Sequence, residues 1–206
     1  MISAILLCAG ESKRLGAPKA LLTLDAKTSS KTFVRNAIEQ IFKSGVEELV
    51  IVTGAYQKEI ELEIRKYFDS LIRLSKLKLV HNDNYKKGMM TSIQRGVKAL
   101  SKESDAFFIS LVDLPFVESK DYRLLAREFR AGTKKLFRAK FAGQPTHPVL
   151  ISTEFKNEIL KSEPVDQGCA FLFKKYPDEI LWCKSDSDRG CIDIDSMKAY
   201  RAHIAV

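Results

Sequence analysis

Short apolar runs alternate with helix-like segments along the first half of the chain. The runs are rich in branched aliphatic and aromatic side chains, which is typical of strands buried on both faces of a sheet. They occupy residues 2–7, 49–52, 77–80 and 106–112. Between them, apolar side chains recur at the three- and four-residue steps of amphipathic helices, over residues 33–42, 60–68 and 90–100. This alternation favours parallel strands joined by right-handed crossovers. The sequence therefore predicts a doubly wound, Rossmann-like α/β fold with a mostly parallel sheet and helices on both faces.

The second half of the chain continues the pattern less regularly. It suggests strands at 135–141, 149–151 and 180–183, and helices at 122–129 and near Glu154, Cys169 and Ser196. No segment rich in Pro, Ser or Gly separates the halves, and no period repeats. A hydrophobic content of 45% over 206 residues is enough for one domain with a sizeable core. We therefore expect a single domain over residues 1–206.

Charge and cysteine content narrow the classes of function. No uncharged run approaches the roughly 18 residues of a membrane-spanning helix, and the apolar start at 2–7 lacks the basic flank of a signal peptide. The four cysteines show no metal-binding spacing, which favours reduced thiols and a cytoplasmic protein without a membrane partner. The net charge of +8 fits either a solvated lysine-rich surface or attraction of polyanionic small molecules. No basic run with interleaved aromatics points to nucleic acid.

The segment between the first strand and the first helix carries the densest set of chemically useful residues. Residues 7–19 have the sequence LCAGESKRLGAPK, and those suited to phosphate are Ala9, Gly10, Ser12, Arg14 and Lys19. Small residues let backbone amides approach an anion, a hydroxyl donates to phosphate, and arginine and lysine add a planar fork and a point charge. The spacing is neither that of a P-loop nor GxGxxG. We therefore expect a distinct triphosphate-binding loop, with Arg14 and Lys19 both accessible to solvent.

A carboxylate follows the strand predicted for residues 106–112. In open parallel sheets, ligands collect at the carboxyl ends of the strands, so Asp113 and the loop after Leu7 should share one rim. Mg²⁺ binds one or two protein carboxylates together with phosphate oxygens and water. Asp113 is therefore a candidate magnesium ligand, although an aspartate at the end of a strand can also simply cap a turn.

Several segments resemble, in order, motifs of the nucleotidyltransferase family that includes molybdenum cofactor cytidylyl- and guanylyltransferases. Residues 7–19 resemble its LxAGxSxRMGxxK signature, and residues 81–92 resemble its NxxYxxGMxxS segment. The segments VDLP, THPV, DQGCA and DIDS resemble GDxP, GHPV, GDxGA and the start of DIDTPED; they lie at 112–115, 146–149, 166–170 and 193–196. The resemblance implies a fold of the nucleotide-diphospho-sugar transferase type. It also implies a nucleotide-binding half over 1–115 and an acceptor-binding half over 116–206.

The resemblance assigns roles to individual residues. The implied nucleotide-binding residues are Leu7, Ala9, Gly10, Ser12, Arg14, Lys19, Gly88 and Ser92, and the implied catalytic residues are Arg14, Lys19 and Asp113. Mg²⁺ would be held by Asp113 and Asp195, with Asp193 as a supporting group. The acceptor would be bound by His147, Asp166 and Gly168. The implied reaction is transfer of a nucleoside monophosphate to a phosphorylated acceptor, with release of pyrophosphate.

The resemblance implies CTP as donor and molybdopterin, or its molybdenum form, as acceptor; a molybdenum hydroxylase could receive the product. In the family, Ala at the position of Ala9 accompanies CTP and Gly accompanies GTP, while UTP is not excluded. Val112 and Thr146 replace family glycines and are expected to crowd the acceptor pocket. Two alternatives stay open: a sugar phosphate or phospho-alcohol as acceptor, and a non-catalytic carrier of the molybdenum cofactor. A carrier would not need both Asp113 and Asp195, so their joint presence favours an enzyme.

Overall fold

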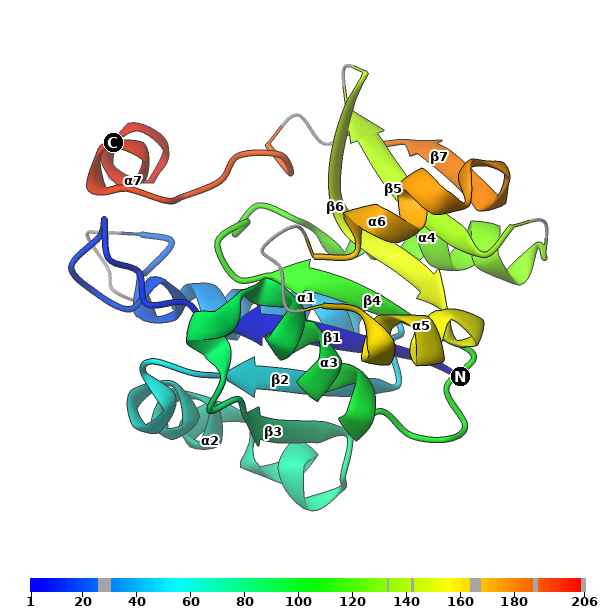
Figure 1. The fold of residues 1–206 in the computed structure, drawn as a ribbon. Coiled ribbons are helices and arrows are strands. Elements are labelled where there is room, and N and C mark those ends of the chain that lie inside the picture. The colour runs from blue at the N-terminus through cyan, green and yellow to red at the C-terminus, as the bar shows by residue number, and fades with distance from the viewer. Residues whose placement is uncertain (26–30, 133, 142, 164–167, 187–188, 205–206) are drawn as a thin grey trace.

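The computed structural model describes residues 1–25, 31–132, 134–141, 143–163, 168–186 and 189–204. Its centre is a seven-stranded sheet with the strand order β3-β2-β1-β4-β6-β5-β7. The strands are β1 (Ile2–Cys8), β2 (Glu48–Thr53), β3 (Leu77–His81), β4 (Ala106–Leu111), β5 (Leu136–Phe141), β6 (Gln144–Ser152) and β7 (Ile180–Lys184). The helices are α1 (Phe33–Lys43), α2 (Gln57–Arg73), α3 (Met89–Ala99), α4 (Ser119–Arg130), α5 (Lys156–Lys161), α6 (Ala170–Lys175) and α7 (Met197–His203). Figure 1 shows helices on both sides of the sheet.

One strand of the sheet runs against the others. β6 pairs antiparallel with β4 and with β5, whereas the remaining pairs are parallel. Only residues 142–143 separate β5 from β6, and so short a connection can join antiparallel strands but not parallel ones. The sequence predicts only 149–151 of this strand, while β6 already begins at Gln144. Pro145 and Pro148 explain the difference, because prolines within a run argue against a strand.

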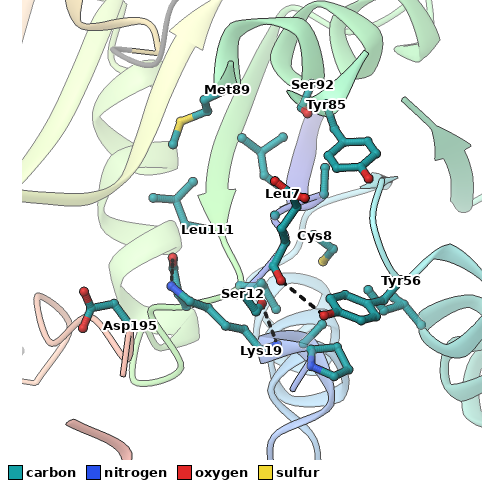
Figure 2. Close-up of a pocket in the computed structure, with 18 of the residues that line it drawn as sticks. Leu7, Cys8, Ser12, Lys19, Tyr56, Tyr85, Met89, Ser92, Leu111 and Asp195 are labelled. Carbon is teal, nitrogen blue, oxygen red and sulfur yellow. Dashed lines mark hydrogen bonds and ion pairs between the residues drawn. The ribbon is translucent and has the colours of Figure 1, made fainter. Parts of the chain in front are cut away.

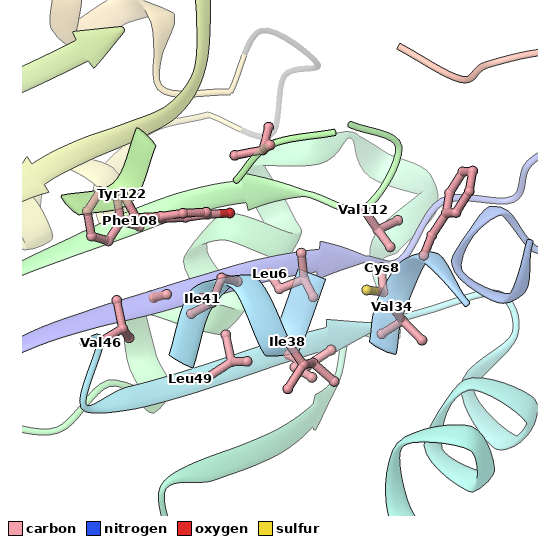
Figure 3. Close-up of a cluster of buried hydrophobic side chains, with 14 of the residues drawn as sticks. Leu6, Cys8, Val34, Ile38, Ile41, Val46, Leu49, Phe108, Val112 and Tyr122 are labelled. Atoms are coloured by element: carbon pink, nitrogen blue, oxygen red, sulfur yellow. The ribbon is translucent and has the colours of Figure 1, made fainter. Parts of the chain in front are cut away.

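The strands bury both faces in apolar layers. On β1, Leu6 belongs to one layer and Ile5 to the other, and both are fully buried. The first layer also holds the apolar sides of α1, α2 and α4, and the second those of α3, α5 and α6. Figure 3 shows the first layer, with Ile38 and Ile41 of α1 beside Leu6 and Leu49 of the strands. The doubly wound, mostly parallel α/β fold predicted from the sequence is confirmed.

Helix α1 shows how local sequence sets the element boundaries. The Thr32 side chain accepts a hydrogen bond from the Arg35 amide and so caps the start of the helix. Gly45, with φ of 91°, follows its end in the left-handed conformation that favours glycine. None of the described helices is both long enough and apolar enough to span a membrane.

After β7 the chain returns to the strand ends of the first half. Ile194 is fully buried, and its amide donates a hydrogen bond to the carbonyl oxygen of Asp113 at 2.9 Å. In α7, the Tyr200 hydroxyl donates to the carbonyl oxygen of Thr23 at 2.8 Å, and its ring lies 6.3 Å from that of Phe33. These contacts hold the C-terminal segment beside the loop that follows β1 (Figure 1).

Candidate nucleotide-binding site

A pocket of about 440 Å³ opens at the carboxyl ends of β1 and β4, where open α/β sheets bind their ligands. Of the residues predicted for the site, it is lined by Leu7, Ala9, Gly10, Ser12, Arg14, Lys19, Ser92, Asp113 and Asp195. Figure 2 shows the Lys19 side chain between Asp195 on one side and Tyr56 on the other. The fold thus brings the glycine-rich loop, the end of β4 and the C-terminal segment to one place.

The loop after β1 is held in shape by its own hydrogen bonds. Ser12 adopts a φ of 51°, its carbonyl oxygen accepts from the Leu15 amide at 2.9 Å, and its Oγ accepts from the Lys19 amide at 3.0 Å. Leu15 is buried beneath the loop. On the far side, the Tyr56 hydroxyl donates to the carbonyl oxygen of Glu11 at 3.3 Å. Hydrogen bonds at Glu11, Ser12 and Lys19 therefore fix the backbone of the loop. Because Ser12 Oγ acts as an acceptor in its bond to the Lys19 amide, its hydroxyl proton stays available for a ligand.

Gly54, just after β2, allows the loop to lie close to the neighbouring strand. A β-carbon at this position would lie 2.5 Å from the carbonyl oxygen of Ala9 and 2.9 Å from the Tyr85 ring. Real side chains do not tolerate such distances, so only glycine fits without moving the loop. The Ala55 amide adds a hydrogen bond to the same Ala9 oxygen at 3.3 Å.

Lys19 lies against the carboxylate that ends β4. Its Nζ is 3.1 Å from Asp113 Oδ2 and 4.0 Å from Asp193 Oδ1. The Lys19 side chain lines the pocket but is only 18% exposed, so it is accessible to a ligand in the pocket and less exposed than Arg14. The C-terminal segment passes close to Lys19, because the Ile194 amide donates to the Asp113 carbonyl oxygen and Asp193 Oδ1 lies 4.0 Å from Lys19 Nζ. Arg14 is as accessible as predicted, with 76% of its side chain exposed.

The C-terminal acids take different positions around the pocket. Asp195 is paired with Arg14 and lines the pocket, with 29% of its side chain exposed. Asp193 is 56% exposed and, among the residues described, is absent from the pocket lining. Burial, followed by the negative charge of Asp113, raises the pKa of Asp193. Negative charge therefore accumulates on this side of the pocket beyond what Lys19 and Arg14 neutralise.

The donor set fits Mg²⁺ bound together with phosphates. In the described part of the chain, no group of three or more His, Cys, Asp or Glu side chains forms a complete metal cage. Mg²⁺ does not require one, because it takes one or two carboxylates and completes its shell with phosphate oxygens and water. Asp113 and Asp195 both line the pocket and supply two carboxylates, one beside Lys19 and the other beside Arg14.

The third wall of the pocket comes from the start of α3. Gly88, with φ of 118°, turns the chain into the helix, and Met89 and Ser92 then line the pocket. Ser92 is buried, and its Oγ accepts a hydrogen bond from the Asn82 side chain at 2.9 Å. Gly88 itself is outside the described lining, so its contribution is to shape the backbone. Tyr85, three residues before Gly88, completes this wall.

The two described residues predicted for the acceptor lie outside this pocket. Of the described residues, neither His147 nor Gly168 lines it, and Asp166 falls outside the described part of the chain. A β-carbon at Gly168 would lie 3.3 Å from Met89 Sδ, which places this glycine behind the α3 wall. His147 Nδ1 is 3.4 Å from the carbonyl oxygen of Ile109. Burial and the positive charge of Arg138 lower the pKa of His147 to about 4, so this imidazole is neutral at pH 7.

Val112 and Thr146, expected to crowd the acceptor pocket, make other contacts. Val112 lines the nucleotide pocket and packs into the layer that holds α1. Thr146 is buried, and its hydroxyl donates to the carbonyl oxygen of Gly190 at 3.2 Å. Thr146 therefore ties β6 to the segment that leads to Asp195.

Comparison with known proteins assigns the chain to a family. A profile of the MobA-like NTP transferase domain matches residues 4–180. The chain belongs to the MobA-like NTP transferase family. It is 26% identical, over 151 residues, to molybdenum cofactor cytidylyltransferase of Escherichia coli K12, covering 73% of this chain and 70% of that protein. It is 24% identical, over 200 residues, to nicotine blue oxidoreductase of Paenarthrobacter nicotinovorans, covering 93% and 92%.

A solved structure shows the same fold. A nucleotidyl transferase from Methanothermobacter superposes with a TM-score of 0.79 at 17% identity, covering all of this chain and 96% of the other. The profile match shows that this chain is of the MobA-like nucleotidyltransferase family, and the superposition shows the shared fold.

Several residues of the MobA-like site escaped prediction from the sequence. Gly54, Tyr56 and Tyr85 shape the pocket, yet no role was expected for them. A signal existed for Gly54, because it follows a buried strand and the carboxyl ends of parallel strands share one rim. No comparable signal marks Tyr56, whose contact with Glu11 joins positions 45 residues apart in the sequence.

Proposed function

We propose that this MobA-like transferase is a magnesium-dependent cytidylyltransferase that transfers CMP from CTP to a phosphorylated acceptor and releases pyrophosphate. The observation that carries the proposal is the convergence of two cations and two carboxylates on one strand-end pocket. Lys19 lies 3.1 Å from Asp113, and Arg14 is paired with Asp195. Cationic donors suit a triphosphate, and carboxylates suit its metal ion.

The proposed chemistry requires positioning and charge neutralisation more than covalent catalysis. An oxygen of the acceptor phosphate attacks the α-phosphorus of the nucleotide, and the bond to the departing pyrophosphate breaks. Lys19 and Arg14 exchange their carboxylate partners for oxygens of that pyrophosphate. Mg²⁺, bound by Asp113 and Asp195, would neutralise further charge on the phosphates. The backbone at Ala9 and Gly10 faces the nucleotide.

Ala9 supports the choice of CTP. It lines the pocket, is 6% exposed, and has its carbonyl oxygen and β-carbon directly beside Gly54. In the family that the sequence resembles, Ala at this position accompanies CTP and Gly accompanies GTP. UTP is close to CTP in size, so direct competition has to distinguish the two pyrimidines.

For the acceptor we propose molybdopterin or its molybdenum form. The support is the resemblance of the segments around His147 and Gly168 to the cytidylyltransferase motifs, together with the relative named molybdenum cofactor cytidylyltransferase. A molybdenum hydroxylase in the cytoplasm would then receive the dinucleotide product.

A second candidate activity comes from the other relative. Nicotine blue oxidoreductase matches over nearly its whole length. The second candidate activity for this chain is therefore that of an oxidoreductase, and the experiment below tests it as well. The acid pair Asp113 and Asp195, each against a cation, favours transfer of a phosphate-linked group instead.

Pyrophosphate release tests these proposals together. The purified protein and Mg²⁺ are mixed with each of the four nucleoside triphosphates and with molybdenum cofactor, a sugar phosphate or a phospho-alcohol. We expect release with CTP and molybdenum cofactor only. Release with another acceptor would reassign the substrate, whereas cofactor binding without release would indicate a carrier. In a parallel mixture that supplies NADH or NADPH and a quinone-type electron acceptor, oxidation of the nicotinamide coupled to reduction of the acceptor, with no pyrophosphate from the other mixtures, would indicate the oxidoreductase.

A further inference from the structure

Arg138 on β5 is a partly buried cation that forms no ion pair with any described carboxylate. Its Nε donates to the carbonyl oxygen of Thr146 at 3.3 Å, and its guanidinium carbon lies 5.8 Å from the centre of the Phe173 ring. Burial lowers the pKa of Arg138. Buried charges are costly unless they are paired, and guanidinium groups pair best with carboxylates and phosphates. The guanidinium group of Arg138 is thus suited to an external anion.

A second cation extends from the same face of the sheet. Residues two apart on a strand share a face, and Ala139 between them is buried in the opposite layer, so Arg138 and Lys140 project to the same side. Lys140 Nζ lies 3.8 Å from the centre of the Trp182 ring on β7. Trp182 is the register partner of Arg138 and is 39% exposed. The face carrying both cations is therefore reachable from solvent at the β7 edge.

His147 connects this face with the acidic rim of the nucleotide pocket. β6 lies between β5 and β4 in the sheet. The positive charge of Arg138 lowers the pKa of His147, and the negative charge of Asp113 raises it. Arg138 of β5 pairs with Val149 of β6, and Val149 pairs with Ile109 of β4, the strand that Asp113 follows, so an anion at Arg138 would lie two strands from the acidic rim.

We propose that Arg138, assisted by Lys140, binds the phosphate group of the acceptor on the face of β5 and β7 next to His147. This assignment rests on the proposed nucleotidyl transfer for its biological meaning, but the anion site itself can be tested without nucleotide or metal. The substrate class it implies is a phosphate monoester.

Trp182 is the one tryptophan of the chain and serves as a local reporter. Fluorescence is titrated with inorganic phosphate and with glycerol 2-phosphate, against sodium chloride at matched ionic strength. Movement of Lys140 from the indole to the ligand should give a saturable change, with tighter binding of the monoester. Arg138→Gln should weaken binding about tenfold or more, because it removes a charged donor. Arg130→Gln, an exposed cation at the end of α4, should leave the titration unchanged.

Steady-state kinetics separates this site from the transfer reaction. Arg138→Gln should raise the KM for the acceptor about tenfold or more while the KM for CTP stays within about twofold. Equal titrations of wild type and Arg138→Gln, or a response that sodium chloride reproduces, would overturn the anion site even if transfer is established. A saturable response lost in Arg138→Gln would uphold it even if no nucleotidyl transfer is found.

Discussion

Among single residues, Lys19 and Arg14 carry the main catalytic assignment. Each lies against a carboxylate of the same rim, and each would neutralise charge that develops on the leaving pyrophosphate. Lys19→Ala and Arg14→Ala should each reduce turnover about 100- to 1,000-fold. Lys175→Ala is the matched control, because Lys175 is 59% exposed, paired with Glu158 and outside the described pocket lining. Initial rates of pyrophosphate release measure the effect. Near-normal turnover in either the Lys19 or the Arg14 variant would show that the substituted residue has no catalytic role.

The two neighbouring acids should differ in their link to the metal. Asp195 lines the pocket beside Arg14, whereas Asp193 is more exposed and lies 4.0 Å from Lys19. Residues two apart in an extended segment have Cα atoms about 6.5–7 Å apart, and Mg²⁺ needs its ligand oxygens at about 2.1 Å. Asp195→Asn should therefore raise the Mg²⁺ concentration for half-maximal rate far more than Asp193→Asn does. The reverse order would assign the ligand to Asp193.

At the level of elements, the close approach of the loop to the end of β2 is the feature most sensitive to substitution. Gly54→Ala places a methyl group 2.5 Å from the Ala9 carbonyl oxygen, so the loop must move. We expect a loss of about 1–3 kcal/mol of unfolding free energy, together with weaker nucleotide binding. Gly10→Ala is the control for stability, since its added β-carbon meets nothing within 4 Å. Urea denaturation compares the two, and equal stabilities would show that the packing at Gly54 is looser than described.

The sequence predicts elements well where a pattern is local and poorly where contacts are distant. The strand–helix alternation predicts the parallel core, because periodicity reports which faces are buried. Pro145 and Pro148 conceal most of β6, whose pairing depends on β4 and β5 lying on either side of it. The loop at 7–19 carries its chemistry in its own residues. That Arg138 lacks an ion-pair partner among the described residues becomes visible only when β5, β6 and α6 are packed together.

For the molecule as a whole, His147 links stability to pH. Burial and Arg138 lower its pKa to about 4, while the unfolded chain has a histidine pKa of about 6.5. Between these values the unfolded chain binds a proton that the folded protein does not, so stability falls as the pH drops from about 6.5 to about 4.

Between pH 6.5 and 4 the free energy of unfolding should fall by about 2 kcal/mol less in His147→Gln than in the wild type, allowing for the partial exposure of the ring. Urea denaturation at several pH values between 7 and 4.5 measures it. His203→Gln, at the exposed end of α7, is the control. An unchanged slope in His147→Gln would mean that His147 titrates in the folded protein as it does in the unfolded chain.

The central claim is transfer of CMP from CTP to the phosphate of molybdenum cofactor at the Lys19–Asp113 pocket. Mass spectrometry of the product formed from all four nucleoside triphosphates at equal concentration, with Mg²⁺ and molybdenum cofactor, tests it most directly. We expect a CMP adduct of the cofactor with one pyrophosphate released per adduct, and loss of both in Lys19→Ala. A GMP adduct would contradict the base assignment drawn from Ala9. An unchanged cofactor, with no pyrophosphate released from any triphosphate, would contradict the claim itself.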